Sequence, residues 1–76
     1  SLEAGITAKI VHIEDEPKVV YEQILAKKLH MGSQVHILSS DDHAVRFLSE
    51  GTEYNLSPII VGNISVRELN QSEIYE

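Results

Sequence analysis

Three consecutive carboxylates, Glu14, Asp15 and Glu16, are the densest group of potential ligands in this sequence. They stand between an apolar stretch and Pro17. Carboxylate oxygens are hard ligands that suit Mn(II) or Fe(II), and His12 is close enough along the chain to add a ring nitrogen. The same charges would also favour the positive end of a helix that begins at Pro17, with Asp15 as its cap. We expect the three carboxylates to stabilise the start of this helix, and we keep metal binding by them as the alternative.

The histidines offer a second possible metal site, but they are spread along the chain. His12, His36 and His43 fall in or beside three different strands, so only a fold that gathers those strands could bring them onto one ion. We expect solvated histidines. The sequence contains no Gly-rich phosphate loop, nucleophile elbow or HExxH pattern. Carboxylates in one exposed turn do not make an acid/base pair, so we predict that the chain is not an enzyme.

Length and charge restrict the possible partners. A chain of 76 residues is one domain with a small core. Twelve Asp and Glu residues against six Lys and Arg residues give a net charge of -6, which disfavours binding to nucleic acid. No apolar run reaches the roughly 20 residues that span a bilayer. Together with the absence of cysteine, these features predict a cytoplasmic domain that contacts neither nucleic acid nor membrane.

Residues 19–38 are the stretch around which the chain is organised. Apolar residues recur at helical spacing and gather on one face: Val20, Tyr21, Ile24, Leu25 and Leu29. Gly32 follows the last of them, where helices commonly end. The spacing predicts a helix that starts at Pro17 and stops before Gly32. Residues 35–38 then alternate between apolar and polar types, which is the period of a strand with one buried face.

The remaining segments predict four more strands, at 8–13, 44–49, 52–56 and 64–66, with a tight turn at Glu50 and Gly51. Pro58 excludes a central strand, so 57–61 is predicted to form one short helical turn. Five short strands with a single helix between the first two can curl into a small closed barrel, and the predicted fold class is mostly β. The predicted core comprises Val35, Ile37, Val45, Phe47, Ile64 and Val66.

Three segments, IVHIEDEP, LHMGSQVHIL and LSPIIVGNISV, resemble a known module at matching spacings. They resemble the domain of ferrous iron transport protein A (FeoA) and, more closely, the C-terminal SH3-like domain of metal-dependent repressors of the diphtheria toxin repressor (DtxR) family. The resemblance covers about residues 5–69 and implies an SH3-like five-stranded barrel with one α-helix between the first two strands. Met31 and Lys28 depart from the family pattern, where proline and glycine are common, which suggests a different helix end.

In such repressors, the resemblance implies, an N-terminal winged helix binds DNA and a middle domain dimerises and binds Fe(II) or Mn(II). The implied partners of this domain are then the other domains or subunits of a homodimeric parent. In some members the appended domain lends oxygen ligands to the metal. Asp15 matches the acidic position, with Glu14 and Glu16 as neighbours, but Lys18 lies nearest the glutamine position and a lysine cation does not ligate a metal. We expect Mn(II) or Fe(II) in the full-length protein and no tight metal binding by these residues alone.

Two alternatives stay open beside this hypothesis. One is a free-standing FeoA-like module that regulates a ferrous iron transporter. The other is a truncated phosphorelay receiver, because KIVHIEDEP followed by a helix resembles the start of one, but Gly62 and Asn63 stand where that family needs an aspartate. We predict a C-terminal interaction and metal-response domain of an iron- or manganese-dependent repressor. Because the chain opens on Ser1, we expect a fragment, with vector or linker residues at 1–4, the domain at 5–69 and a tail at 70–76.

Overall fold

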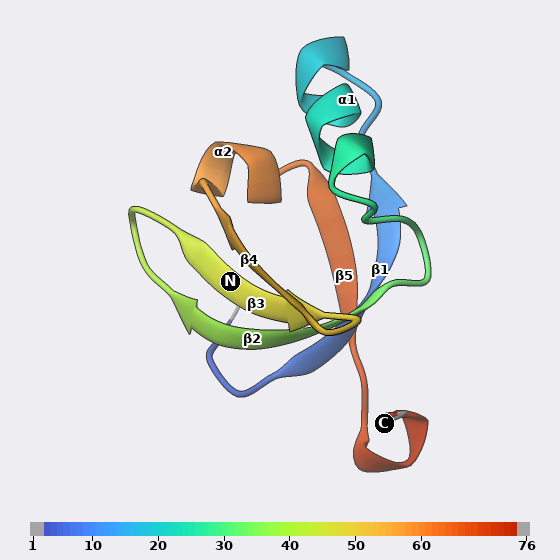
Figure 1. Ribbon diagram of the computed structural model, residues 1–76. Coiled ribbons are helices and arrows are strands. Elements are labelled where there is room, and N and C mark those ends of the chain that lie inside the picture. The colour runs from blue at the N-terminus through green and yellow to red at the C-terminus, as the bar shows by residue number, and fades with distance from the viewer. Residues whose placement is uncertain (1–2, 75–76) are drawn as a thin grey trace.

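Residues 3–74, the part of the chain that the computed structural model describes, form five strands, two short α-helices and one 3-10 turn (Figure 1). Ser1 and Leu2 of the predicted linker and Tyr75 and Glu76 of the predicted tail lie outside the described residues. The predicted mostly β fold, with one helix between the first two strands, is confirmed. In chain order the elements are β1 (Thr7–Ile13), α1 (Lys18–Ala26), β2 (Gln34–Ser40), β3 (Val45–Ser49), β4 (Thr52–Leu56), α2 (Pro58–Val61), β5 (Ile64–Glu68) and the 3-10 turn η1 (Gln71–Glu73).

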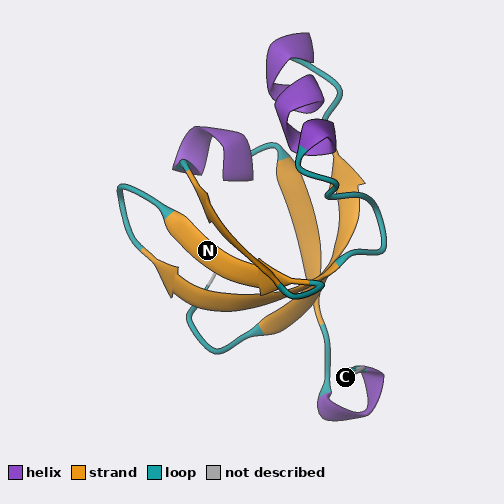
Figure 2. Ribbon diagram, viewed as in Figure 1, coloured by secondary structure: helices purple, strands orange, loops and turns teal. Residues whose placement is uncertain are grey.

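The strands form one antiparallel sheet in the order β4-β3-β2-β1-β5 (Figure 2). The register shifts between Ile10 and His12 in β1 and between Ile37 and Ser39 in β2. Such irregularities bend strands, and here the sheet curls on itself. Within the described residues β4 and β5 are the two sheet edges, and α2 connects them. The SH3-like barrel is therefore partly open rather than closed by a continuous ladder.

Alternation along the strands builds the core. Val35 and Ile37 of β2 and Val45 and Phe47 of β3 are buried, as predicted, and the Phe47 ring stacks on Tyr54 with centroids 5.1 Å apart. Ile64 and Val66 were also expected to be buried, but they are half-buried because β5 is an edge strand with a neighbour on one side only. The remaining core residues are Ala8, Ile10, Ile13, Ile24, Leu29 and Leu56.

Two predicted turns are confirmed. Glu50 and Gly51 connect β3 to β4 with φ angles of 51° and 82°, the left-handed values that a two-residue hairpin turn requires. The predicted helical turn at 57–61 appears as α2, where the Ser57 hydroxyl oxygen accepts a hydrogen bond from the Ile60 N–H at 3.4 Å. Pro58 occupies the first helical position, where its missing N–H costs nothing.

The predicted start of the first helix at Pro17 is confirmed, because Pro17 is the N-cap of α1, but the predicted end and the predicted capping residue are wrong. Helix α1 stops at Ala26, well short of the predicted end next to Gly32, because Lys28 takes the left-handed φ of 66° and turns the chain. Leu29, at 1% exposure, therefore reaches the core from a loop, whereas Leu25 on the helix is 43% exposed. At the other end Pro17 is the N-cap and no side chain caps the helix, so Asp15 does not have the predicted capping role.

The chain after β5 was predicted to be a polar tail, but its described part folds. Leu69 is buried, and Asn70 caps η1 through a hydrogen bond from the Ser72 N–H to its side-chain oxygen at 3.1 Å. The Asn70 N–H in turn donates to the Glu73 carboxylate at 3.1 Å, which completes a capping box. The predicted domain boundaries at residues 5 and 69 stay predictions. Among residues 3–74, no helix is long and apolar enough to cross a bilayer.

Candidate functional site

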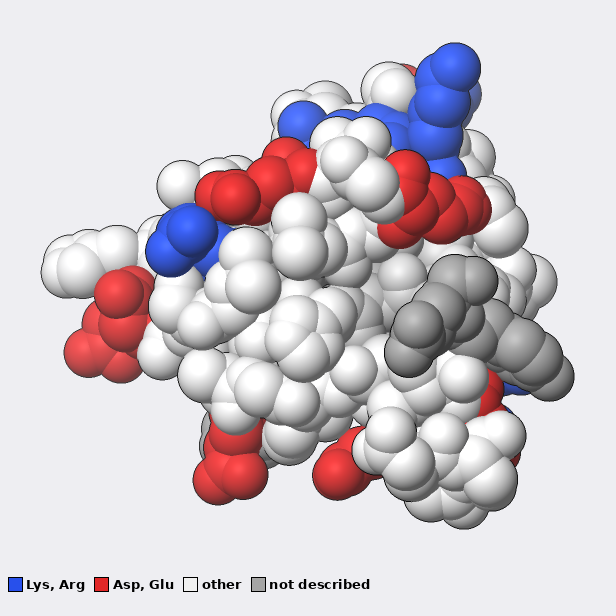
Figure 3. Space-filling model, turned by 60° about the horizontal axis from the view of Figure 1, so that its bottom comes forward, with Lys and Arg blue, Asp and Glu red and all other residues white. Residues whose placement is uncertain are grey.

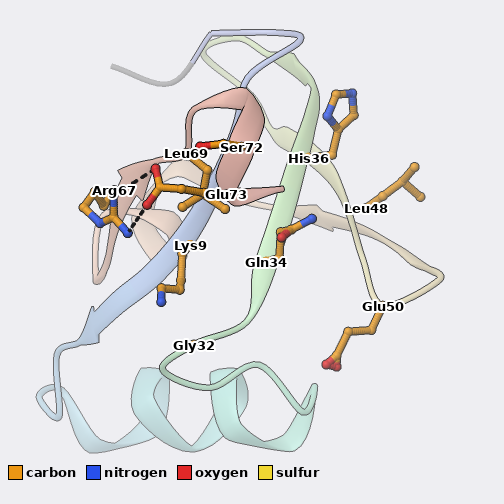
Figure 4. A pocket seen from close by; sticks show the side chains of 10 residues that line it. All are labelled: Lys9, Gly32, Gln34, His36, Leu48, Glu50, Arg67, Leu69, Ser72 and Glu73. Atoms are coloured by element: carbon orange, nitrogen blue, oxygen red, sulfur yellow. Dashed lines mark hydrogen bonds and ion pairs between the residues drawn. The ribbon is translucent and has the colours of Figure 1, made fainter. Parts of the chain in front are cut away.

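A groove of about 690 Å³ lies on the outer face of the sheet, between η1 and the β3–β4 turn (Figure 4). The barrel interior, by contrast, holds a void of only about 20 Å³ lined by apolar side chains. That interior volume is at most enough for one water molecule. A ligand of this domain must therefore bind outside the barrel. The groove is lined by Lys9, Gly32, Gln34, His36, Leu48, Glu50, Arg67, Leu69, Ser72 and Glu73.

The floor of the groove follows from strand alternation. Ala8 and Ile10 point into the core, so Lys9 between them points outward. In the sheet register Lys9 lies opposite Gln34 on β2 and opposite Arg67 on β5. Two cations from distant parts of the chain are thereby placed on neighbouring strands, in the middle of an acidic protein.

One wall is η1, held to the floor by an ion pair. The Arg67 guanidinium donates to both carboxylate oxygens of Glu73, with N–O distances of 3.1 and 3.5 Å (Figure 4). The hydrogen bond from the Asn70 N–H, the Arg67 contact and the nearby Lys9 charge together hold the pKa of Glu73 below its ordinary value of 4.5. Glu73 is therefore an ionised carboxylate at neutral pH, seated beside two cations.

Lys9 differs from Arg67 in its partners. Across residues 3–74 the Lys9 ammonium forms no hydrogen bond or ion pair, although its charge reaches Glu73. It is half-buried on the sheet. The floor of the groove thus carries one cation that the described part of the chain leaves unneutralised.

The opposite end of the groove combines polar, apolar and acidic side chains, from His36, Leu48 and Glu50. The His36 ring nitrogen Nδ1 lies 2.9 Å from the Thr7 hydroxyl oxygen, within hydrogen-bond distance. Leu48 beside it is 39% exposed and gives the groove an apolar surface. Glu50 closes this end, with its carboxylate 3.9 Å from His30 Nε2. The groove therefore runs from a cationic end to an anionic end past a leucine.

The predicted metal ligands lie elsewhere, in the exposed loop between β1 and α1. Glu14, Asp15 and Glu16 are all exposed, and Glu14 contacts His12 Nε2 at 3.1 Å. No group of three or more His, Asp or Glu side chains in residues 3–74 is arranged to hold a metal ion. The metal role predicted for Glu14, Asp15 and Glu16, together with ligands from other domains, stays a prediction.

The histidines are solvated, as predicted: His12, His30, His36 and His43 are all exposed. Asp41 beside His43 accepts hydrogen bonds from the N–H groups of His43 and Ala44 at 2.7 and 3.0 Å, which lower its pKa. This arrangement caps a turn. On the face that Figure 3 shows, acidic side chains lie at several separate places, and the net charge of the chain is -6.

Sequence reasoning did not find the groove. The alternation of residues 8–10 could have placed Lys9 on the outer face, but Arg67 becomes its neighbour only through the β1–β5 register. The sequence signal for η1 was also missed. Asn70 is followed three residues later by Glu73, which is the spacing of a capping box at the start of a helical turn.

The fold is of the SH3-like class, and solved structures with this architecture include the following two. A crystal structure of an iron uptake regulatory protein, FeoA, matches with a TM-score of 0.80 and 17% identity, over 91% of this chain and 92% of the other. An NMR structure of a FeoA-like protein from Clostridium acetobutylicum matches with a TM-score of 0.83 and 18% identity, over 99% and 88%. No protein-family profile and no curated protein matches the sequence. At this identity the likeness establishes the fold.

Proposed function

We propose that this chain is a non-catalytic interaction module of the FeoA type that serves iron uptake or its regulation. The observation that carries the proposal is the match to FeoA and FeoA-like structures over nearly the whole of both chains. One of those proteins is described as an iron uptake regulatory protein. We infer that this module has a comparable regulatory role, which it performs through contacts with another protein.

A binding role rather than a chemical one is supported by the groups that could do chemistry. A general acid or base works best with a pKa near the operating pH. Asp41 and Glu73 have pKa values shifted the other way, because backbone N–H groups in turns stabilise their charged forms. Both carboxylates organise local structure.

Two settings fit this module. The segment pattern described above favours the C-terminal domain of a DtxR-type repressor, whose partners would be its own domains and subunits in a homodimer and whose cofactor would be Mn(II) or Fe(II). A free-standing module that regulates a ferrous iron transporter is supported by the similar structures, because this chain spans 92% and 88% of those chains. In either setting the -6 charge disfavours direct contact with nucleic acid.

The test is removal of residues 5–69 from the gene in the source organism, with two readouts. The first is uptake of radiolabelled Fe(II), and the second is the response of metal-regulated transcripts to added iron and manganese. Lower uptake with intact transcription would identify the transport module, and loss of metal-dependent repression would identify the repressor domain. If neither readout changes, the proposed function is wrong.

A further inference from the structure

We propose that the groove between η1 and the β3–β4 turn is the docking surface for a short acidic segment of a partner protein, whose carboxylate pairs with Lys9 and Arg67 while an apolar neighbour packs on Leu48. The inference rests on the proposed function as an interaction module and names the surface and the partner chemistry.

The protein itself shows that this surface accepts a carboxylate. Glu73 sits against Arg67 with N–O distances of 3.1 and 3.5 Å, and Lys9 contributes to the field that keeps it ionised. Glu73 neutralises Arg67 but does not contact the Lys9 ammonium. A second carboxylate can therefore bind at Lys9 next to the one that the chain supplies, or it can replace Glu73 at Arg67.

The distribution of charge along the groove favours one orientation of the segment. The chain carries a net charge of -6, so an acidic segment is repelled by the molecule as a whole, and within the groove it is attracted by Lys9, a cation that no residue in the described part of the chain pairs. Glu50 at the far end repels a second carboxylate there and favours amide or cationic donors. The segment should therefore bind in one direction, with its acidic residue toward β5.

Shape and surface chemistry favour a peptide over an ion. A volume of about 690 Å³ is far larger than a single anion needs, and the groove is open along a sheet face. Leu48, at 39% exposure, offers apolar contact beside the cations. An extended segment of a few residues satisfies both features.

Binding can be measured on the full 76-residue chain, labelled with nitrogen-15, by NMR titration at low salt. The ligand is the peptide acetyl-Ser-Leu-Glu-Leu-Ser-amide, and the matched control peptide carries Gln in place of Glu. We expect saturable shifts of the amides of Lys9, Gln34 and Leu48 at millimolar peptide. The Gln peptide should bind more weakly by about two- to five-fold, the range for an exposed ion pair.

Two variants should change the affinity in opposite directions. Lys9→Gln should weaken binding about two- to five-fold and Lys9→Arg should restore it, whereas Glu73→Gln should tighten binding because Arg67 is released. Lys18→Gln, which makes the same change in net charge on exposed α1, should leave the affinity unchanged. Opposite effects of Lys9→Gln and Glu73→Gln are not expected from general destabilisation.

Four results would overturn the proposal. The first two are the absence of saturable shifts and equal affinity for the Glu and Gln peptides. The others are a loss of affinity in Lys18→Gln equal to that in Lys9→Gln, and the same shifts with inorganic phosphate alone, which would show a simple anion site. Failure here is separable from failure of the proposed function. If the peptide does not bind but removal of residues 5–69 still alters iron uptake or metal-dependent transcription, the module acts through another surface.

Discussion

Phe47 supplies the most direct test of the barrel. Its side chain is 4% exposed, lies at the centre of β3 and stacks on Tyr54 with an interplanar angle of 14°. Truncation of a fully buried Phe to Ala costs about 3 to 5 kcal/mol, which combines lost transfer free energy with the cavity left behind. The loss of the stacking contact with Tyr54 is included in that range, because a pair of aromatic rings contributes about 0.5 to 1.5 kcal/mol beyond burial.

That loss is large for a domain of this size. At roughly 0.05 to 0.15 kcal/mol per residue, the 76-residue chain has a free energy of unfolding of about 4 to 11 kcal/mol. Phe47→Ala should therefore remove about a quarter or more of the stability and lower the midpoint of urea denaturation. The far-ultraviolet circular dichroism signal at 25 °C is a suitable measurement.

Leu48→Ala is the matched control, because Leu48 follows Phe47 on the same strand but points to the outer face. Its truncation should cost less than about 1 kcal/mol, as surface substitutions usually do. A cost below about 1 kcal/mol for Phe47→Ala, or an equal cost for both variants, would show that the faces of β3 are assigned wrongly.

Three other predictions concern the loops and the termini of the elements. Lys28→Gly should raise the free energy of unfolding by up to about 1 kcal/mol, since glycine adopts the φ of 66° without steric cost, and a loss of stability would contradict a left-handed residue there. The lowered pKa of Glu73 means that its ionised form is favoured in the folded state, so its contribution to stability is present above the ordinary carboxyl pKa and is lost as pH falls through the depressed folded value. Glu73→Gln should therefore make the free energy of unfolding depend less on pH in the acid range. An unchanged pH dependence would refute the contacts of Glu73 with Arg67 and Asn70. Asp15→Ala should weaken metal-dependent operator binding modestly if the full-length protein is a repressor, whereas calorimetry on this chain should show no tight Mn(II) binding. An unaltered metal response in that variant would refute a metal role for Glu14, Asp15 and Glu16.

Much of the fold could be predicted because its signals are local. The alternation around Val35 and Phe47, the turn residues Glu50 and Gly51, and the start of α2 at Pro58 each depend on a few neighbouring side chains. The end of α1 could not be predicted this way. Leu25 and Leu29 have the spacing of one helical face, and only a left-handed turn at Lys28 shows that Leu29 fills the core from a loop.

The amino-acid sequence alone determined the order of the strands and of the two helices, the net negative charge and the buried positions of β2 and β3, because these depend on composition and on the two-residue period of a strand. The tertiary structure alone decided which distant residues meet. Lys9 and Arg67 become neighbours through the β1–β5 register, and Glu73 reaches them because η1 folds back onto the sheet. The groove exists for the same reason: it is formed by pairing between strands far apart in the chain, and no local pattern encodes that pairing.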